Sequence, residues 1–417
     1  MPAETSPGAG SGLPAVCTDH RLVALENGTG AARYAASLRR AAAQAGYATE
    51  LLVDAAGPGA PVPSRLRKLL AALPPLAQAA PLHAGRRLAP DAFRRAQVHF
   101  DIHGRYLRLR GDALPALMHW SYPLPLHLAG VPNLYSVLDL IPLLQPGLTP
   151  VGQRRARRML ARLRHEADHL VTISEASRRE IVATLGWPPE RVTNTFMATD
   201  VPDWGPAQAR LAAAAACRAA GVAPGGYFLH VGTVERRKNV ARLVEAYRAS
   251  GSRRALVLAG PDGWRAAEEL QGAAGLLRPA GQGAPRVVRL GWTARDTLLG
   301  LVAGATAVLA PSLAEGFGLP AVEAMALGAP ALTSRGGATE EITGGAALLV
   351  DPRDVAALAD AIRALDQQPG LRASLAAAGR RRAQAFSPEA HAARLGALYA
   401  RVLAPRPVPD ARGQARP

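Results

Sequence analysis

The segment from Pro311 to Gly328, PSLAEGFGLPAVEAMALG, carries two glutamates on either side of a glycine turn. The apolar run Ala307–Ala310 precedes the turn, and Pro320 suits the first turn of a helix, where its missing N–H is not needed. Free backbone N–H groups at a helix start favour an anion such as a pyrophosphate. Glu323, expected in the first helical turn, is placed to accept hydrogen bonds from a ribose diol. Taken alone, Glu315 is more simply explained as a surface carboxylate and Glu323 as one that complements the helix dipole, but the pair favours a ligand site.

A second glycine turn follows the apolar run Tyr227–Val231, in the segment VGTVERRKN. This segment places Arg237 and Lys238 at the start of an expected helix, an unfavourable position for cations unless an anion meets them. Only two of the 49 basic residues are lysines, the other 47 being arginines. Lys238 therefore indicates a place that requires a compact ammonium, which can point at one phosphate oxygen where a planar guanidinium cannot. The alternative is a solvated basic turn.

Taken in order, these segments resemble glycosyltransferase family 4, a retaining family with the GT-B fold that contains many bacterial mannosyl- and glucosyltransferases. EGFGLPAVE is similar to the E-x7-E motif of that family, and VGTVERRKN is similar to its phosphate-binding segment. Asn133–Leu143 and Leu170–Val192 are similar to segments of its first domain. The resemblance implies transfer of a hexose, with mannose from GDP-mannose as the first choice, to a glycan or polyprenyl-linked acceptor. No Asp-x-Asp element is placed to hold a metal, so we expect no cofactor and a metal-independent reaction.

The resemblance also implies roles for individual residues. Glu315 would orient the donor sugar, while Arg237 and Lys238 would stabilise the departing diphosphate. The other expected donor contacts come from both glycine turns, the first loop and a residue near the base: Glu323, Gly316, Phe317, Gly318, Leu319, Gly232, Gly30 and Trp292. An ordinary helix entry remains open for Gly30, whose loop also contains Gly28, and core packing remains open for Trp292.

Two positions depart from the family pattern. Leu138 stands before Asp139 where relatives carry a histidine that lines the sugar site, and a leucine side chain cannot hydrogen-bond to a sugar. Asp139, His119 and His103 are therefore the candidates for the sugar or acceptor site, although a single histidine is more often structural. The missing histidine leaves open a catalytically degenerate partner subunit. Thr233 replaces an arginine of some relatives, so that cation is missing or supplied elsewhere.

Short apolar runs alternate with amphipathic stretches along the chain, which predicts parallel sheets covered by helices. In the second half we expect strands at Tyr227–Val231, Ala255–Ala259, Arg286–Leu290, Ala307–Ala310 and Ala331–Ser334, and helices at Asn239–Ser250, Ala266–Gly275, Arg295–Ala303 and Pro320–Leu327. In the first half we expect strands at Leu22–Leu25, Ala48–Val53, Val98–Asp101, Leu134–Leu138 and Leu170–Ile173, and a helix at Gly30–Ala45.

The expected fold is therefore α/β and GT-B, with two Rossmann-like domains that face each other across a deep cleft. We expect an acceptor domain over 1–200 and a donor domain over 201–388, with a linker at Asp200–Pro206. A closing helix over 389–404 would pack back toward the N-terminal domain, and a disordered tail would follow over 405–417.

Composition excludes several classes. Of 417 residues, 49% are hydrophobic and 19% charged, which excludes a disordered chain or a coiled coil. Cys17 and Cys217 are too few for a disulfide framework. The net charge of +17 is spread along the chain, with 23 basic and 15 acidic residues in the first 200, so a nucleic-acid arm is disfavoured.

The start of the chain lacks the pattern of a secretory signal, and no stretch predicts a membrane span. We therefore expect a cytoplasmic protein. One basic stretch, from Gln153 to His165, is a candidate for peripheral contact with anionic lipid on the inner membrane face. A solvated helix face or intramolecular contacts explain the same stretch equally well.

Overall fold

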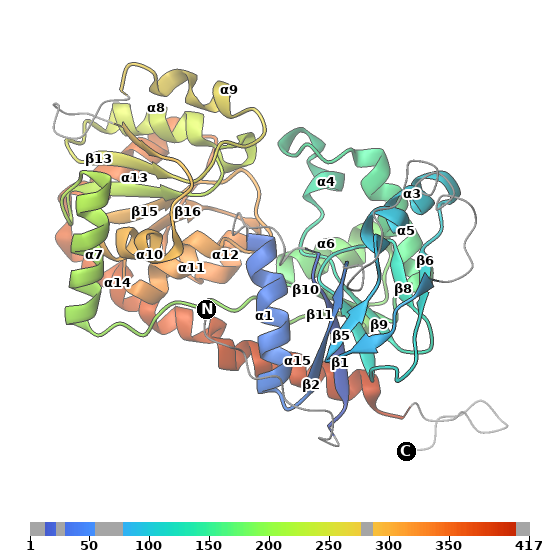
Figure 1. The fold of residues 1–417 in the computed structure, drawn as a ribbon. Coiled ribbons are helices and arrows are strands. Elements are labelled where there is room, and N and C mark those ends of the chain that lie inside the picture. The colour runs from blue at the N-terminus through green and yellow to red at the C-terminus, as the bar shows by residue number, and fades with distance from the viewer. Residues whose placement is uncertain (1–12, 22–29, 55–77, 277–286, 406–417) are drawn as a thin grey trace.

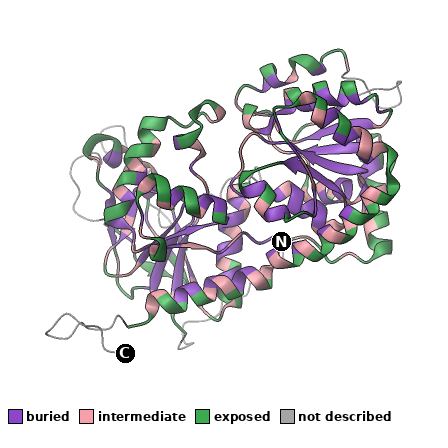
Figure 2. Cartoon of the chain, turned by 180° about the vertical axis from the view of Figure 1, so that it is seen from behind, coloured by how far each residue is buried: buried purple, intermediate pink, exposed green. Residues whose placement is uncertain are grey.

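The computed structural model describes residues 13–21, 30–54, 78–276 and 287–405 of the chain. They form two lobes, each built on a sheet with helices against it, and helix α1 (Gly30–Gln44) lies on the side of the first lobe that faces the second (Figure 1). The strands are the most buried part of both lobes (Figure 2).

The first lobe contains an eight-stranded sheet with the order β11-β10-β9-β7-β1-β2-β5-β4, in which only β4 and β5 pair antiparallel. Its strands are β1 (Ala15–Asp19), β2 (Ala48–Val53), β4 (Leu82–His83), β5 (Arg86–Leu88), β7 (Leu117–Trp120), β9 (Asn133–Ser136), β10 (His169–Thr172) and β11 (Val192–Asn194). A small parallel sheet contains β3 (Gln78–Ala79), β6 (Leu107–Arg110) and β8 (Leu126–Leu128). The helices after α1 are α3 (Ala92–His103), α4 (Ile141–Leu144), α5 (Gln153–Glu166) and α6 (Glu175–Leu185).

The second lobe contains a six-stranded, wholly parallel sheet with the order β14-β13-β12-β15-β16-β17. Its strands are β12 (Tyr227–Val231), β13 (Ala255–Ala259), β14 (Val287–Leu290), β15 (Ala307–Ala310), β16 (Ala331–Ser334) and β17 (Leu348–Val350). The helices are α7 (Pro206–Ala220), α8 (Val240–Ser250), α9 (Ala266–Leu270), α10 (Arg295–Gly304), α11 (Leu319–Leu327), α12 (Gly337–Thr343), α13 (Val355–Gln367) and α14 (Pro369–Ala383). When its strands are numbered from β12 as the first, this order is 3-2-1-4-5-6, which is that of a Rossmann domain. Ligands of such domains bind where the strand order reverses, here between β12 and β15.

Helix α15 (Pro388–Leu403) leaves the second lobe and runs along the first (Figure 1). Its residues Leu395, Leu398 and Tyr399 join a buried apolar cluster with Tyr34 and Leu38 of α1. The same cluster includes residues of α11 and α12, so one core is shared by both lobes.

Polar contacts also join the lobes. The carboxylate of Glu341 in α12 accepts hydrogen bonds from the backbone N–H groups of Glu175 and Ala176, at 2.8 and 2.7 Å. These groups lie at the start of α6, where a carboxylate complements the helix dipole. The second lobe therefore caps a helix of the first.

The expected α/β, GT-B arrangement of two Rossmann-like units is confirmed, but one strand prediction is wrong. Val98–Asp101 lies inside helix α3, where Phe93, Ala96 and Phe100 form a buried stripe at helical spacing. The expected strand Leu22–Leu25 lies outside the described residues, as does almost all of the expected tail. The first strand, Ala15–Asp19, is not among the expected ones. Asp200–Pro206 runs between the lobes up to the start of α7.

Candidate active site

A cavity of about 1210 Å³ lies between the two lobes, at the carboxyl ends of their central strands. Segments that follow β1, β7 and β9 line it from the first lobe, and segments that follow β12, β13 and β15 line it from the second. The expected site residues that line it are Gly30, Asp139, Gly232, Arg237, Lys238, Trp292, Glu315, Gly316, Phe317, Gly318, Leu319 and Glu323. Of the remaining candidates, Gly28 lies outside the described residues, while His103 and His119 are not in this lining.

Glu315, Lys238 and Arg237 form one bonded cluster at this cavity. The Nζ atom of Lys238 lies 2.5 Å from Oε1 of Glu315, and Nη1 of Arg237 lies 2.9 Å from Oε2. Ser312 donates the third hydrogen bond to this carboxylate, at 2.8 Å to Oε1, and Arg237 also pairs with Glu235 at 2.7 Å. Two cations are therefore matched by two carboxylates.

Backbone geometry brings the two turns of this cluster together. Arg237 and Lys238 lie in a short 3-10 turn over Arg236–Lys238, just before α8, while Glu315 follows β15. The N–H of Leu313 donates to the carbonyl of Arg237 at 2.8 Å, which ties the turns to each other. Loops after neighbouring parallel strands meet at one edge of the sheet, so this juxtaposition follows from the β12–β15 pairing.

The cluster holds Glu315 ionised. Burial raises the pKa of the Glu315 carboxyl, but the charges of Lys238 and Arg237 outweigh burial and lower this pKa to about 2. Burial lowers the pKa of the Lys238 ammonium despite the opposing attraction of Glu315. The pKa of Arg237 rises, because attraction to Glu315 and Glu235 exceeds the cost of burial. The site is thus a preorganised set of charges in a mostly water-excluded position.

The glycine turn after Glu315 packs directly against the first lobe. A Cβ atom added to Gly316 would lie 2.9 Å from the carbonyl oxygen of Leu138 and 3.2 Å from Oδ2 of Asp139. Only glycine therefore permits this approach between the lobes. Phe317 is buried behind the turn, with its ring 5.4 Å from the ring of Phe386, and Gly318 caps α11 with a positive φ of 91°.

Glu323 lies in the second turn of α11, not in its first turn as expected, and is only 1% exposed. Its Oε1 atom pairs with Arg33 of α1, in the first lobe, and with Arg295 of α10 in the second lobe. The Arg295 contact is 2.6 Å long, and the same Nη2 atom donates to the carbonyl of Asp200 at 2.9 Å. Glu323 therefore sits at a charged bridge between the lobes.

The candidate sugar and acceptor residues are placed differently from one another. Asp139 accepts a 3.0 Å hydrogen bond from the N–H of Ile141, and burial raises the pKa of its carboxyl. His119 is fully buried in β7, where its ring nitrogens bond to Tyr399 at 2.7 Å and Ser136 at 2.9 Å. Burial lowers the pKa of His119 to about 3, so the ring is neutral and holds the core together. His103 is exposed at the end of α3.

Trp292 is 60% exposed at the rim of the cavity, which excludes core packing for this residue.

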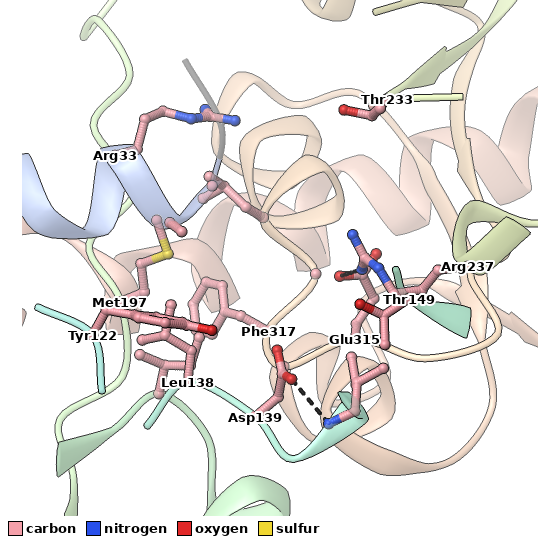
Figure 3. A pocket seen from close by; sticks show the side chains of 18 of the residues that line it. Arg33, Tyr122, Leu138, Asp139, Thr149, Met197, Thr233, Arg237, Glu315 and Phe317 are labelled. Carbon is pink, nitrogen blue, oxygen red and sulfur yellow. Dashed lines mark hydrogen bonds and ion pairs between the residues drawn. The ribbon is translucent and has the colours of Figure 1, made fainter. Parts of the chain in front are cut away.

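The structure also adds cavity-lining residues that the sequence did not reveal: Arg33, Tyr122, Thr149 and Arg295. Figure 3 shows Arg33 on one side of the cavity and Thr233, Arg237 and Glu315 on the other. Arg33 lies in the first-loop segment Glu26–Tyr34, but arginine is abundant throughout the chain, so residue type alone does not single out Arg33 or Arg295.

Neither a metal site nor a membrane span is evident in the described parts of the chain. Within those ranges, no three His, Cys, Asp or Glu side chains are grouped to hold a metal ion. The helices of the same ranges are all too short or too polar to cross a bilayer.

Two Rossmann-like domains with their strand ends around one cleft define the GT-B class. The sequence matches the profile of glycosyl transferases group 1 over residues 225–368 and that of Glycosyltransferase Family 4 over residues 28–193. The chain therefore belongs to the family 4, or group 1, glycosyltransferases.

Curated relatives agree with this membership. The chain is 32% identical over 224 residues to the O-antigen chain mannosyltransferase B of Escherichia coli. This aligned region covers 52% of this chain and 56% of that protein. It is 42% identical over 113 residues to the MMP alpha-(1->4)-mannosyltransferase of Mycolicibacterium hassiacum, covering 26% and 28% of the two chains. It is 29% identical to the D-inositol 3-phosphate glycosyltransferase of Kribbella flavida, over 75% of this chain and 73% of that protein. The match thus spans little more than half of the first relative, and less of the second.

Solved structures share the fold. The sucrose-phosphate synthase of Thermosynechococcus elongatus superposes with a TM-score of 0.68 at 22% identity, covering 94% of this chain and 99% of that one. Anabaena HepE in complex with UDP and glucose superposes with a TM-score of 0.63 at 17% identity, covering 94% and 99%.

Proposed function

We propose that this protein is a retaining glycosyltransferase that moves a hexose from a nucleoside-diphosphate sugar to a hydroxyl group of an acceptor. The observation that carries the proposal is the Glu315–Lys238–Arg237 cluster, which lies at the point of the second sheet where a Rossmann domain binds its ligand. The solved relative with UDP and glucose supports a nucleotide-sugar donor.

The chemistry follows from the charges in the cleft. The bond between the sugar C1 and the diphosphate oxygen breaks, and the acceptor oxygen forms a new bond to C1 on the same face. The acceptor proton passes to an oxygen of the departing diphosphate. Negative charge grows on that diphosphate, so cations fixed in advance at Arg237 and Lys238 stabilise the transition state more than the ground state.

Glu315 holds these cations in place and presents a permanent carboxylate to the hydroxyls of the sugar. Its low pKa keeps it an acceptor of hydrogen bonds throughout the neutral range. The Oε2 atom of Glu323, which has no hydrogen-bond partner among the residues that the structure describes, is assigned to the ribose of the donor. No step of this scheme uses a metal, and we propose that the reaction is metal-independent.

Mannose, carried by GDP, is the first choice of donor sugar, because two of the relatives named above are mannosyltransferases. The acceptor is proposed to be a glycan or a polyprenyl-linked glycan, consistent with the O-antigen relative. Leu138 lines the cavity without a polar atom in its side chain, which is the observation that favours the second candidate, a degenerate glycosyltransferase-like subunit.

Contact with anionic lipid is proposed for α5, through Arg154 and Arg157 on its exposed side. Three other arginines of this helix serve the fold instead. Arg158 donates to the carbonyl of Phe100, Arg155 pairs with Asp101 at 3.4 Å, and Arg162 pairs with Glu166 at 2.9 Å.

A donor screen tests the proposed function. The purified protein is incubated with GDP-mannose, UDP-glucose and dTDP-sugars, and release of the nucleoside diphosphate is measured with and without candidate glycan acceptors. We expect turnover with one class of donor, highest with GDP-mannose, and an α-linked product by NMR from an α-linked donor. Donor binding without turnover would identify the degenerate subunit, and absence of any nucleotide-sugar binding would refute the proposal.

A further inference from the structure

The cations expected to meet the donor diphosphate are already neutralised in this structure. Arg237 and Lys238 contact two carboxylates, Glu235 and Glu315, so the cluster has no net charge. A diphosphate that enters this site brings at least two negative charges. A second source of positive charge in the cavity wall would therefore add to the backbone N–H groups of the glycine turn in binding it.

The second charged cluster at the cavity has an excess of positive charge. Arg33 and Arg295 share one carboxylate, Glu323, and both contacts go to its Oε1 atom. Three polar atoms of this cluster are buried without a partner among the described residues: Oε2 of Glu323, Nε of Arg33 and Nη1 of Arg295. Leaving such atoms unsatisfied is costly, which indicates that a ligand supplies their partners.

The unpartnered atoms match consecutive parts of a nucleotide. One is a carboxylate oxygen, which accepts from ribose hydroxyls, and two are guanidinium N–H donors, which bind phosphate oxygens. Since all three belong to one bonded cluster, a ribose on Glu323 places the first phosphate beside the arginines. Burial lowers the pKa of Arg33, and the charge of Arg295 lowers it as well, against the attraction of Glu323.

We infer that Arg33 and Arg295 form a diphosphate subsite that spans the cleft, with Arg33 reaching from the first lobe to the phosphates of the donor. This inference rests on the proposed function and assigns its anion-binding residues. Arg33 points across the cavity toward the turn that carries Thr233 (Figure 3). Thr233 occupies the position where some relatives supply an arginine from the second lobe, so this chain provides the cation from the opposite wall.

The two arginines of this subsite come from different lobes. Arg33 is 28% exposed and belongs to α1, whereas Glu323 and Arg295 belong to the second lobe. A diphosphate bound to both arginines therefore adds a contact between two lobes that the Arg33–Glu323 pair already joins.

Binding measurements on a ladder of ligands test the inference. Calorimetry compares guanosine, GMP and GDP, and in parallel uridine, UMP and UDP, on the full-length wild type and on Arg33→Gln, Arg33→Lys and Arg295→Gln. We expect Arg33→Gln to weaken diphosphate binding by roughly 10- to 150-fold, as for loss of a charged hydrogen bond. Nucleoside binding should change less than threefold, and Arg33→Lys should restore part of the diphosphate affinity.

Arg254→Gln is the matched control, because Arg254 is 30% exposed and pairs with Asp366 at 2.7 Å outside the cavity lining. It should leave all affinities unchanged. Equal losses for nucleoside and diphosphate in Arg33→Gln would mean that Arg33 only positions Glu323, and no loss would mean that it does not bind donor; either result overturns the inference. If circular dichroism shows that Arg33→Gln does not fold, the same comparison of diphosphate and nucleoside affinities is made on Arg295→Gln and Arg33→Lys. If the wild type binds no nucleoside diphosphate at all, the proposed function fails and the inference fails with it.

Discussion

Replacement of Lys238 tests the charge cluster most directly. The Nζ atom of Lys238 lies 2.5 Å from Oε1 of Glu315, and the residue is 9% exposed. Lys238→Ala removes one preorganised cation from the position where the departing diphosphate gains charge. Loss of one such donor typically costs ~10²–10³ in kcat, equivalent to about 2.7–4 kcal/mol of transition-state stabilisation.

Lys238→Arg should recover only part of this loss, and the packing explains why. A Cβ atom placed on Gly232 would lie 3.3 Å from Cε and 3.6 Å from Cδ of Lys238, so the lysine stem runs along the bare backbone of that glycine. A planar guanidinium is wider than an ammonium, so an arginine side chain that follows the same path along Gly232 cannot place its charge where Nζ of Lys238 lies. The chain uses arginine at 47 positions and lysine at two, so the lysine at position 238 is informative.

Single-turnover kinetics with saturating donor separates this effect from donor binding. Arg236→Ala is the matched control, since Arg236 belongs to the same 3-10 turn but is exposed and does not line the cavity. We expect that control to keep wild-type rates. A fully active Lys238→Ala would refute the role of the cluster, and a fully active Lys238→Arg would refute the argument from shape.

Three further predictions address the remaining parts of the site. EDTA should leave turnover unchanged, and activity that is lost to EDTA and restored by magnesium would contradict the metal-free mechanism. Glu323→Gln should raise the donor KM by roughly 10- to 150-fold with a smaller effect on kcat, because the ribose does not change during the reaction; an unchanged KM in a folded variant would leave Glu323 as a bridge between lobes only. The pKa of Glu315 is about 2 in the fold against 4.5 ordinarily, so its stabilising contribution is present above about pH 4.5 and is lost as the pH falls toward 2. Urea titrations should show the difference in unfolding free energy between wild type and Glu315→Gln shrinking by ~3 kcal/mol over that window, and a constant difference would contradict the assigned pKa.

The second lobe was readable from the sequence because its strands are buried on both faces. Runs such as Tyr227–Val231 and Ala255–Ala259 contain almost only apolar residues, and glycines end them at the site. In the first lobe, Val98–Asp101 carries the residue types of a strand, but the stripe of Phe93, Ala96 and Phe100 on α3 decided the outcome. The local residue types favoured a strand, whereas burial of one face favoured a helix, and the helix formed.

Within the site, the residues next to the two glycine turns could be predicted from the sequence. Each turn follows an apolar run and precedes an expected helix, and charged residues flank it. Arg33 and Arg295 were not predicted. Arg33 lies in the first-loop segment Glu26–Tyr34 that resembles the family, but only its glycines were expected to contact the donor, and the shared partner Glu323 lies on a different element from either arginine. The same holds for His119, which the sequence offered as a sugar ligand. Its bond to Tyr399 depends on residues 280 positions apart in the chain, which no local pattern reveals.

That bond has a consequence for how the protein is made. The first lobe is not a continuous piece of the chain, because α15, at residues 388–403, completes the core around α1 and partners the buried ring of His119. A ribosome adds about 5–20 residues per second, so the roughly 190 residues between β11 and α15 take on the order of 10–40 seconds to synthesise. Throughout that interval the nascent first lobe lacks the α15 side chains that cover α1, and the ring of His119 has Ser136 but not Tyr399 as a partner. The core of the first lobe is complete only after α15 has been synthesised, and the chain of the second lobe is synthesised before it.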